Sequence, residues 1–210
     1  AAGNILLQAG TSEGQTGGSI GVSSGTGGFY SGGISLSTAN QGSSASSGNI
    51  LLRTGVADTS SGAIDFETGS AAVGGAGSIS FNAGDSIDSA GGSISFQASD
   101  SQASTGGQVE IKSGASEQQA SGSVLLGTAS SSIASGAAQI STGTSSSGSS
   151  GDINGVTGDS TVDSGNINLV AGKSTANGGS VLITAGDSSA GGGTAGSIAL
   201  LAGSIQGGDD

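Results

Sequence analysis

The sequence predicts an all-β fold: a parallel β-solenoid (β-helix) of about 14 short repeats of ~15 residues, with one repeat per coil. Three observations lead to this prediction. The motif G-x-[I/V]-x-[L/I/V/F]-x-[T/A/S]-[G/A/S] recurs along the whole chain. Apolar residues alternate with polar ones inside the motif, as they do in a strand with one buried face. No segment shows the periodicity of a helix, so alternation of strands and helices is excluded.

The repeat defines the domain organisation. Residues 1–210 are predicted to be a single continuous repeat array, and we expect this array to be an internal segment of a longer protein, because Ala1 and Asp210 both lie close to a repeat. The first glycines of successive repeats are 14 to 17 residues apart, at Gly3, Gly18, Gly32, Gly48, Gly62, Gly77, Gly92, Gly107, Gly122, Gly136, Gly151, Gly165, Gly179 and Gly196.

Each repeat is expected to contribute one short strand. In "GSISFNAG" (Gly77 to Gly84) the residues Ile79, Phe81 and Ala83 share one face, and the third of them is small enough for a corner. We expect the two glycines to supply turn backbone. The same face should be buried in the neighbouring repeats, because a shift of one residue would turn every side chain outward. The residues expected to be buried are Ile64, Phe66, Ile79, Phe81, Ile94 and Phe96, and those expected to be exposed are Asp65, Glu67 and Gln97.

Two coil lengths fit the spacing. With one repeat per coil, Phe66, Phe81 and Phe96 occupy the same position in consecutive repeats and form a short interior ladder. With two repeats per coil, the apolar faces of alternate repeats meet across the core. The run of consecutive phenylalanines favours the first arrangement, but handedness and coil length are not determined by the spacing.

The units "GNINLVAGKSTANGG" (Gly165 to Gly179) and "GSVLITAGDSSAGGG" (Gly179 to Gly193) resemble the short coils of filamentous-haemagglutinin-like β-helical adhesins. They are also similar to Gly/Ser-rich repeat arrays of microbial and algal surface proteins. The resemblance rests on period and alternation, and it implies a right-handed parallel β-helix with a role in extracellular structure or adhesion. It transfers no functional residue to this chain.

The composition argues against an enzyme. The chain has no His and no Cys, so the usual general bases and nucleophile pairs are missing. Paired carboxylates remain, Asp65 with Glu67 and Asp85 with Asp88, but the first pair alternates with apolar residues and is expected on the solvated face. We therefore predict no enzymatic activity and assign no catalytic, cofactor-binding or metal-ligating residue.

Aspartates recur just after the predicted strands, and they leave open a calcium site at the turns, since calcium prefers oxygen ligands. The chain lacks the Gly-Gly-x-Gly-x-Asp repeat of calcium-binding β-rolls, and aspartate is also a common turn residue. No cofactor is therefore predicted. The aspartates concerned are Asp85, Asp88, Asp100, Asp159, Asp163 and Asp187.

Charge and hydropathy limit the partners. The net charge is −12, with three basic residues (Arg53, Lys112 and Lys173), so a nucleic-acid partner is not expected. No apolar run is long enough to predict a membrane span. The Ser/Thr-rich turns, such as Thr142 to Gly151, are candidate sites for O-glycans, with a plain exposed turn as the simpler interpretation.

These features predict a structural protein that forms an extracellular fibre, sheath or cell-surface stalk by stacking of solenoid coils. The expected partner is the chain itself, end to end, or further repeats of the same chain, because neither the first repeat nor the last carries a polar cap. Two alternatives remain: an adhesin or binding module that presents repeated sites for glycans, cations or surfaces, and a disordered spacer.

Overall fold

The computed structural model describes residues 3–40, 42, 45–189 and 191–203. The chain forms two units, Ala1–Val109 and Glu110–Asp210. The boundary falls inside the repeat that begins at Gly107, so the same repeat pattern continues through both units. The expectation that both ends lead into a longer array concerns residues 1, 2 and 204–210, which lie outside the described residues.

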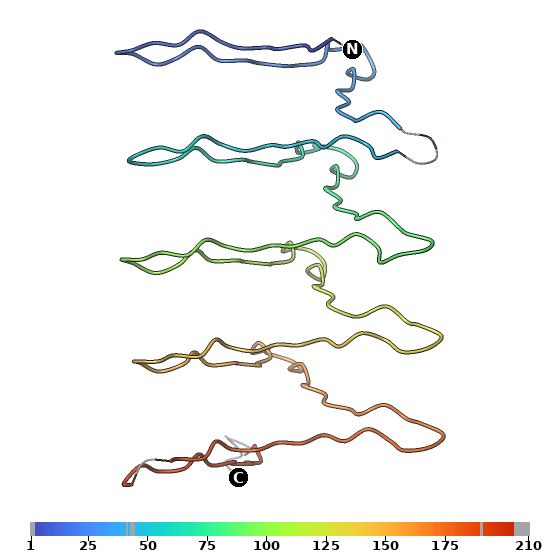
Figure 1. The fold of residues 1–210 in the computed structure, drawn as a ribbon. Coiled ribbons are helices and arrows are strands. Elements are labelled where there is room, and N and C mark those ends of the chain that lie inside the picture. The colour runs from blue at the N-terminus through green and yellow to red at the C-terminus, as the bar shows by residue number, and fades with distance from the viewer. Residues whose placement is uncertain (1–2, 41, 43–44, 190, 204–210) are drawn as a thin grey trace. The chain divides into compact units, whose positions relative to one another are not determined.

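The prediction of a parallel β-solenoid is wrong for this structure: the described residues contain no β-strand and no helix. The apolar segment of each repeat runs as plain extended chain that leads from one loop to the next (Figure 1). A strand requires a hydrogen-bonded neighbour as well as an extended backbone. The alternation of side chains selects the extended backbone, but no described segment of the same chain completes a ladder beside it.

A buried core is also missing from the described residues. The accessible surface of the chain is 20933 Å², whereas a compact protein of 19.1 kDa exposes about 8,400 Å² and its unfolded chain about 27,700 Å². The expected burial of the inward residues is therefore wrong. Their exposed fractions are 46% for Ile64, 59% for Phe66, 48% for Ile79, 55% for Phe81, 50% for Ile94 and 70% for Phe96. Asp65, Glu67 and Gln97 are exposed, as predicted.

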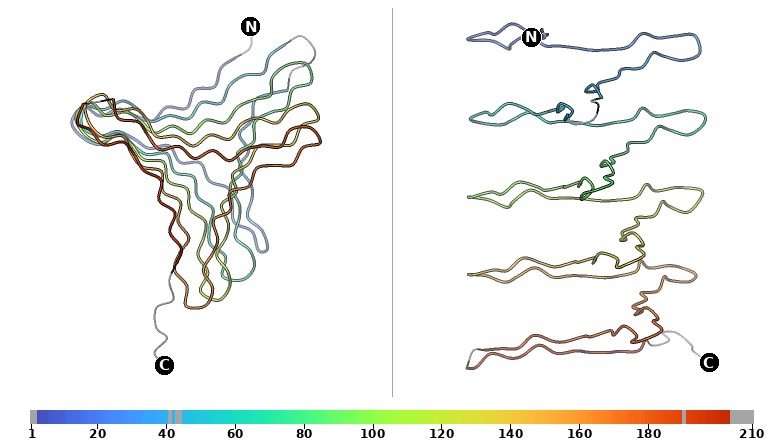
Figure 2. Two further views of the ribbon diagram at one scale, coloured as in Figure 1. Left: turned by 90° about the horizontal axis from the view of Figure 1, so that it is seen from below. Right: turned by 45° about the vertical axis from the view of Figure 1, so that its right-hand side comes forward.

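Narrow loops connect the apolar segments, and within each unit successive loops project in different directions (Figure 2). Serine hydroxyls hold several loop tips. In the loop after Gly84, the Ser89 N–H donates to Ser86 Oγ at 3.1 Å, which is a local side-chain turn. Equivalent bonds are accepted by Ser12, Ser101, Ser116 and Ser145, and Ser131, Ser160 and Ser174 accept from the residue two positions on.

Each loop has a neck where the end of one repeat meets the first glycine of the next. At one neck the Gly92 N–H donates to the Gly84 carbonyl at 2.9 Å. A Cβ on Gly92 would lie 3.0 Å from Ala83 Cβ and 3.2 Å from the Gly84 nitrogen, which is tighter than most contacts that real Cβ atoms make. The close approach of two chain segments therefore requires the first glycine at this neck, and the same holds at Gly18, Gly107, Gly179 and Gly196. Among the described glycines only Gly74 and Gly192 have left-handed backbone, and neither is the first glycine of a repeat. Forming a turn, the role expected of the first glycine, is therefore not its main role.

The size of the residue that faces the first glycine decides whether the neck closes. Where this residue is Ala or Ser, the backbone hydrogen bond forms, at Gly18, Gly32, Gly92, Gly107, Gly122, Gly179 and Gly196. Where it is Thr, no such bond is present among the described necks. A Cβ on the first glycine would be in ordinary contact with the threonine side chain at Gly48, Gly62, Gly77, Gly151 and Gly165, whereas at Gly136, which follows Thr128, it would meet nothing within 4 Å. The larger side chain of threonine keeps the two segments apart.

This relation predicts the result of a reciprocal exchange. Thr68→Ala should allow the Gly77 N–H to bond the Gly69 carbonyl, and Ala83→Thr should break the bond between Gly92 and Gly84. Because a backbone hydrogen bond contributes about 1 kcal/mol net, we expect the exchange protection of the Gly77 amide to rise, and that of the Gly92 amide to fall, by about five-fold. Amide hydrogen exchange followed by NMR measures both. Unchanged protection in both variants would contradict the role given to the threonine.

Candidate functional site

The strongest candidate site is a repeated apolar surface, which we call the apolar stripe. It consists of the first two inward side chains of each repeat and lies between the loops. In the first unit it comprises Ile5, Leu7, Ile20, Val22, Ile34, Leu36, Ile50, Leu52, Ile64, Phe66, Ile79, Phe81, Ile94, Phe96 and Val109; in the second it comprises Ile111, Val124, Leu126, Ile140, Ile153, Ile167, Leu169, Val181, Ile183, Ile198 and Leu200.

The stripe is partly shielded within its own chain. In interior repeats its first position is about half exposed, for example 48% at Ile79 and 50% at Val124. Apolar residues of the loop tips have almost no cover, with 97% exposed at Phe29 and 99% at Ile87. Within a segment the outward neighbour is also more exposed than the first inward residue, for example 93% at Leu125 beside 50% at Val124, although neither kind of position is buried.

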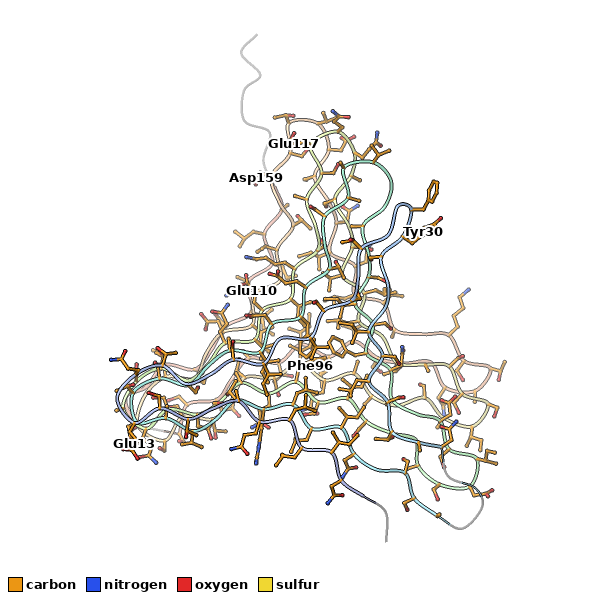
Figure 3. The ribbon with its side chains drawn as sticks, turned by 90° about the horizontal axis from the view of Figure 1, so that it is seen from above. Glu13, Tyr30, Phe96, Glu110, Glu117 and Asp159 are labelled. Atoms are coloured by element: carbon orange, nitrogen blue, oxygen red, sulfur yellow. The ribbon has the colours of Figure 1, made fainter. Side chains whose placement is uncertain are left out.

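Aromatic contacts occur in the first unit. The rings of Phe66 and Phe81 have centroids 6.2 Å apart with an interplanar angle of 89°, and those of Phe81 and Phe96 are 6.1 Å apart at 83°. The predicted contact between phenylalanines of consecutive repeats is thus confirmed. The predicted interior ladder is wrong, because the rings meet edge to face and stay more than half exposed. Figure 3 shows Phe96 at the inner end of the loops, with Glu13 and Tyr30 near loop tips.

The backbone beside the stripe is unpaired within the described chain. A folded protein makes roughly one hydrogen bond per residue. Here the backbone-to-backbone bonds of the described residues are confined to the loop necks. Between Gly92 and Ser99, no backbone group of residues 93–98 bonds to another described backbone group. Extended chain with free N–H and C=O groups next to apolar side chains can pair with another extended chain.

Charge is kept away from the stripe. No acidic or basic residue occupies an inward position, and the carboxylates of residues 3–203 that the structure describes lie in the loops or on the outward face of the segments. On the outward face Glu110 forms an ion pair with Lys112, and their side chains are 53% and 79% exposed, respectively. An ion pair this exposed contributes little to stability. Two stripes can therefore approach each other without opposed like charges at the contact.

The acidic residues singled out from the sequence do not form a site. Asp65 and Glu67 are exposed on the outward face, and Asp85 and Asp88 are exposed in a loop. Within the described residues no group of three or more potential ligands is close enough to hold a metal ion, so the turn aspartates are not brought together into a calcium site. No cavity is present in this part of the chain either.

Sequence reasoning missed two structural roles. One is a serine in the loop, two positions after the glycine or serine that ends the repeat motif. Its hydroxyl accepts a backbone hydrogen bond at the loop tip, at Ser12, Ser86, Ser101, Ser116, Ser145, Ser160 and Ser174. The other is the pairing of the first glycine with the third inward residue. The signal available in the sequence was the recurrence of Ala, Ser or Thr at the third inward position. All described residues of intermediate exposure occupy this position: Ala9, Thr38, Thr54, Ala98, Ala171 and Ala185.

Comparison with known proteins finds no matching family model, no curated protein and no solved structure. The part of the chain that the structure describes holds no helix with the length and apolar character needed to cross a membrane.

Proposed function

We propose that this chain is a structural protein whose repeats associate with other copies of the chain to form an extracellular fibre, sheath or cell-surface stalk. The observation that supports this most directly is the apolar stripe, which recurs in each unit without being buried by its own chain. A chain that buries so little apolar surface does not offset the entropy of ordering its backbone, which is about 1–2 kcal/mol per residue. Association supplies the missing burial.

Apolar side chains outside the stripe add to the surface available for association. Leu125 is 93% exposed and Leu182 is 86% exposed on segments that also carry stripe residues. The net charge of −12 opposes association at low ionic strength, and added salt screens this repulsion.

Sedimentation velocity and electron microscopy of the full chain test the proposal. We expect a shift from monomer to large species as the protein concentration rises, with elongated particles in the images. Because the Debye length falls from about 30 Å at 0.01 M salt to about 8 Å at 0.15 M, we expect the transition at lower protein concentration in the higher salt. A chain that stays monomeric up to its solubility limit in both salts would contradict the proposal.

A further inference from the structure

We propose that copies of this chain associate side by side along the repeats, with the apolar segment of each repeat hydrogen-bonded to an apolar segment of another copy. This inference rests on the self-association proposed above and adds where the copies meet. Its consequence is that interior repeats, and not only the terminal ones, are covered by a neighbouring chain.

The first step is the state of the backbone. Residues 93–98 run as extended chain between two loops and make no backbone-to-backbone hydrogen bond in the described structure, and no side-chain hydrogen bond is accepted or donated there either. Such groups are satisfied by water in a single chain, but they remain free to pair with a second extended segment. Ile94 and Phe96 stand on the same segment at 50% and 70% exposure, so pairing would also cover apolar surface.

The second step identifies the partner. A chain that pairs with several of these segments at once must present an extended apolar segment every 14 to 17 residues, as this chain does. A second copy has the same spacing because its sequence is identical, and it also has uncharged residues at the inward positions. Its carboxylates would remain in the loops and on the outward face, where water screens their repulsion.

The third step is the size of the surface to be covered. The chain exposes 20933 Å², roughly 12,000 Å² more than a compact protein of the same mass. A standard protein interface buries about 1,200–2,000 Å² in total. Contact restricted to the terminal repeats would leave interior residues such as Ile79 and Phe81 as exposed as they are in the single chain. Contact along the repeats is needed to cover them.

Hydrogen exchange measured by mass spectrometry separates these cases. The full chain is compared in two states, dilute monomer and assembled material at high concentration. If copies pair along the repeats, peptides that cover 62–69, 77–84 and 92–99 should exchange at least ten-fold more slowly in the assembly, while the loop peptides between them change little. If only the peptides of the first and last repeats slow down, side-by-side pairing is wrong and the proposed self-association stands. If no assembly forms, the proposed function itself fails.

A matched pair of variants sharpens the test. Ile79→Asp places a charge on the inward side of the segment, and Ser80→Asp places the same charge on its outward side. We expect Ile79→Asp to remove the protection of peptide 77–84 in the assembly and Ser80→Asp to leave it within two-fold of the parent. Neither change removes a buried contact, because Ile79 is 48% exposed and the chain has no described core. Equal effects of the two variants would overturn the proposal.

Discussion

Replacing Phe66, Phe81 and Phe96 together by alanine is expected to raise the protein concentration required for assembly by about a hundredfold or more. Each ring is more than half exposed in the single chain, so about half of the 1.5–3 kcal/mol gained by burying a phenylalanine is still available on association. Three rings then contribute about 2.3–4.5 kcal/mol. Each 1.4 kcal/mol corresponds to a tenfold change in an equilibrium constant, so the middle of this range gives an effect of more than about a hundredfold. Loss of the two edge-to-face contacts adds to the effect.

The measurement is the midpoint of the assembly transition in sedimentation velocity, determined under one salt condition for parent and variant. A control variant carries alanine at Phe29, Val73 and Ile87, which lie in loops and are 97%, 96% and 99% exposed. It removes about three fifths as much apolar side chain, all of it from outside the apolar stripe. We expect its midpoint to stay within about threefold of the parent. A control that weakens assembly as strongly as the stripe variant would show that general hydrophobicity, and not the stripe, drives association.

Valine in place of the first glycine at four necks is expected to open those necks. The positions are Gly18, Gly92, Gly107 and Gly179, where a Cβ would lie 3.0–3.2 Å from the alanine that faces the glycine. Overpacking of this kind costs about 1–3 kcal/mol per site. The N–H at each substituted position should therefore lose about fivefold of its exchange protection, as expected for Ala83→Thr, because the hydrogen bond that closes the neck is broken.

The matched control places valine at the glycine on the other side of a neck, where a Cβ would meet nothing within 4 Å. Gly10, Gly84 and Gly172 serve three of the four necks, and Gly114 at the neck of Gly122 replaces the fourth, where the equivalent residue is Ser99. The chain already contains such a change, since Ser99 stands at the position equivalent to Gly84 and its carbonyl still accepts the neck bond from Gly107 at 2.9 Å. We expect the control to keep the protection of the neck amides within about threefold. Amide exchange by NMR compares both variants with the parent. If both sets of valines act alike, close approach is not the reason for the first glycine.

The prediction of strands was wrong because the alternation of side chains predicts an extended backbone but does not identify the neighbouring segment to which a strand must be hydrogen-bonded. In "GSISFNAG" the alternation predicts Ile79 and Phe81 buried in a strand, whereas they are 48% and 55% exposed on an extended segment that forms no strand. It contains nothing about which segment lies beside this one. With two sizeable apolar residues in about fifteen, a repeat gains too little by stacking on its own chain to select that partner over water.

The candidate site was predicted in part for the same reason. The two-residue period predicts the exposure of Asp65, Glu67 and Gln97, and the structure agrees. The same period selects the residues of the apolar stripe, but their predicted burial is wrong. The loop bonds could not be derived in the same way. A serine in a polar loop is compatible with many turns, and only the path of the backbone after Gly84 brings the Ser89 N–H to Ser86 Oγ.

The sequence by itself determined the length of the repeat, the extended character of its apolar segment, the separation of charge from the apolar residues and the presence of a small residue at the third inward position. These properties are local, since each depends on residues a few positions apart. Only the tertiary structure decided that the neck closes with Ala or Ser and not with Thr, that consecutive phenylalanines meet edge to face, and that the apolar stripe stays open. These depend on the distance between segments of neighbouring repeats. That distance reflects the entropy cost of ordering the backbone and the free energy gained by burying apolar surface, and both involve several repeats at once.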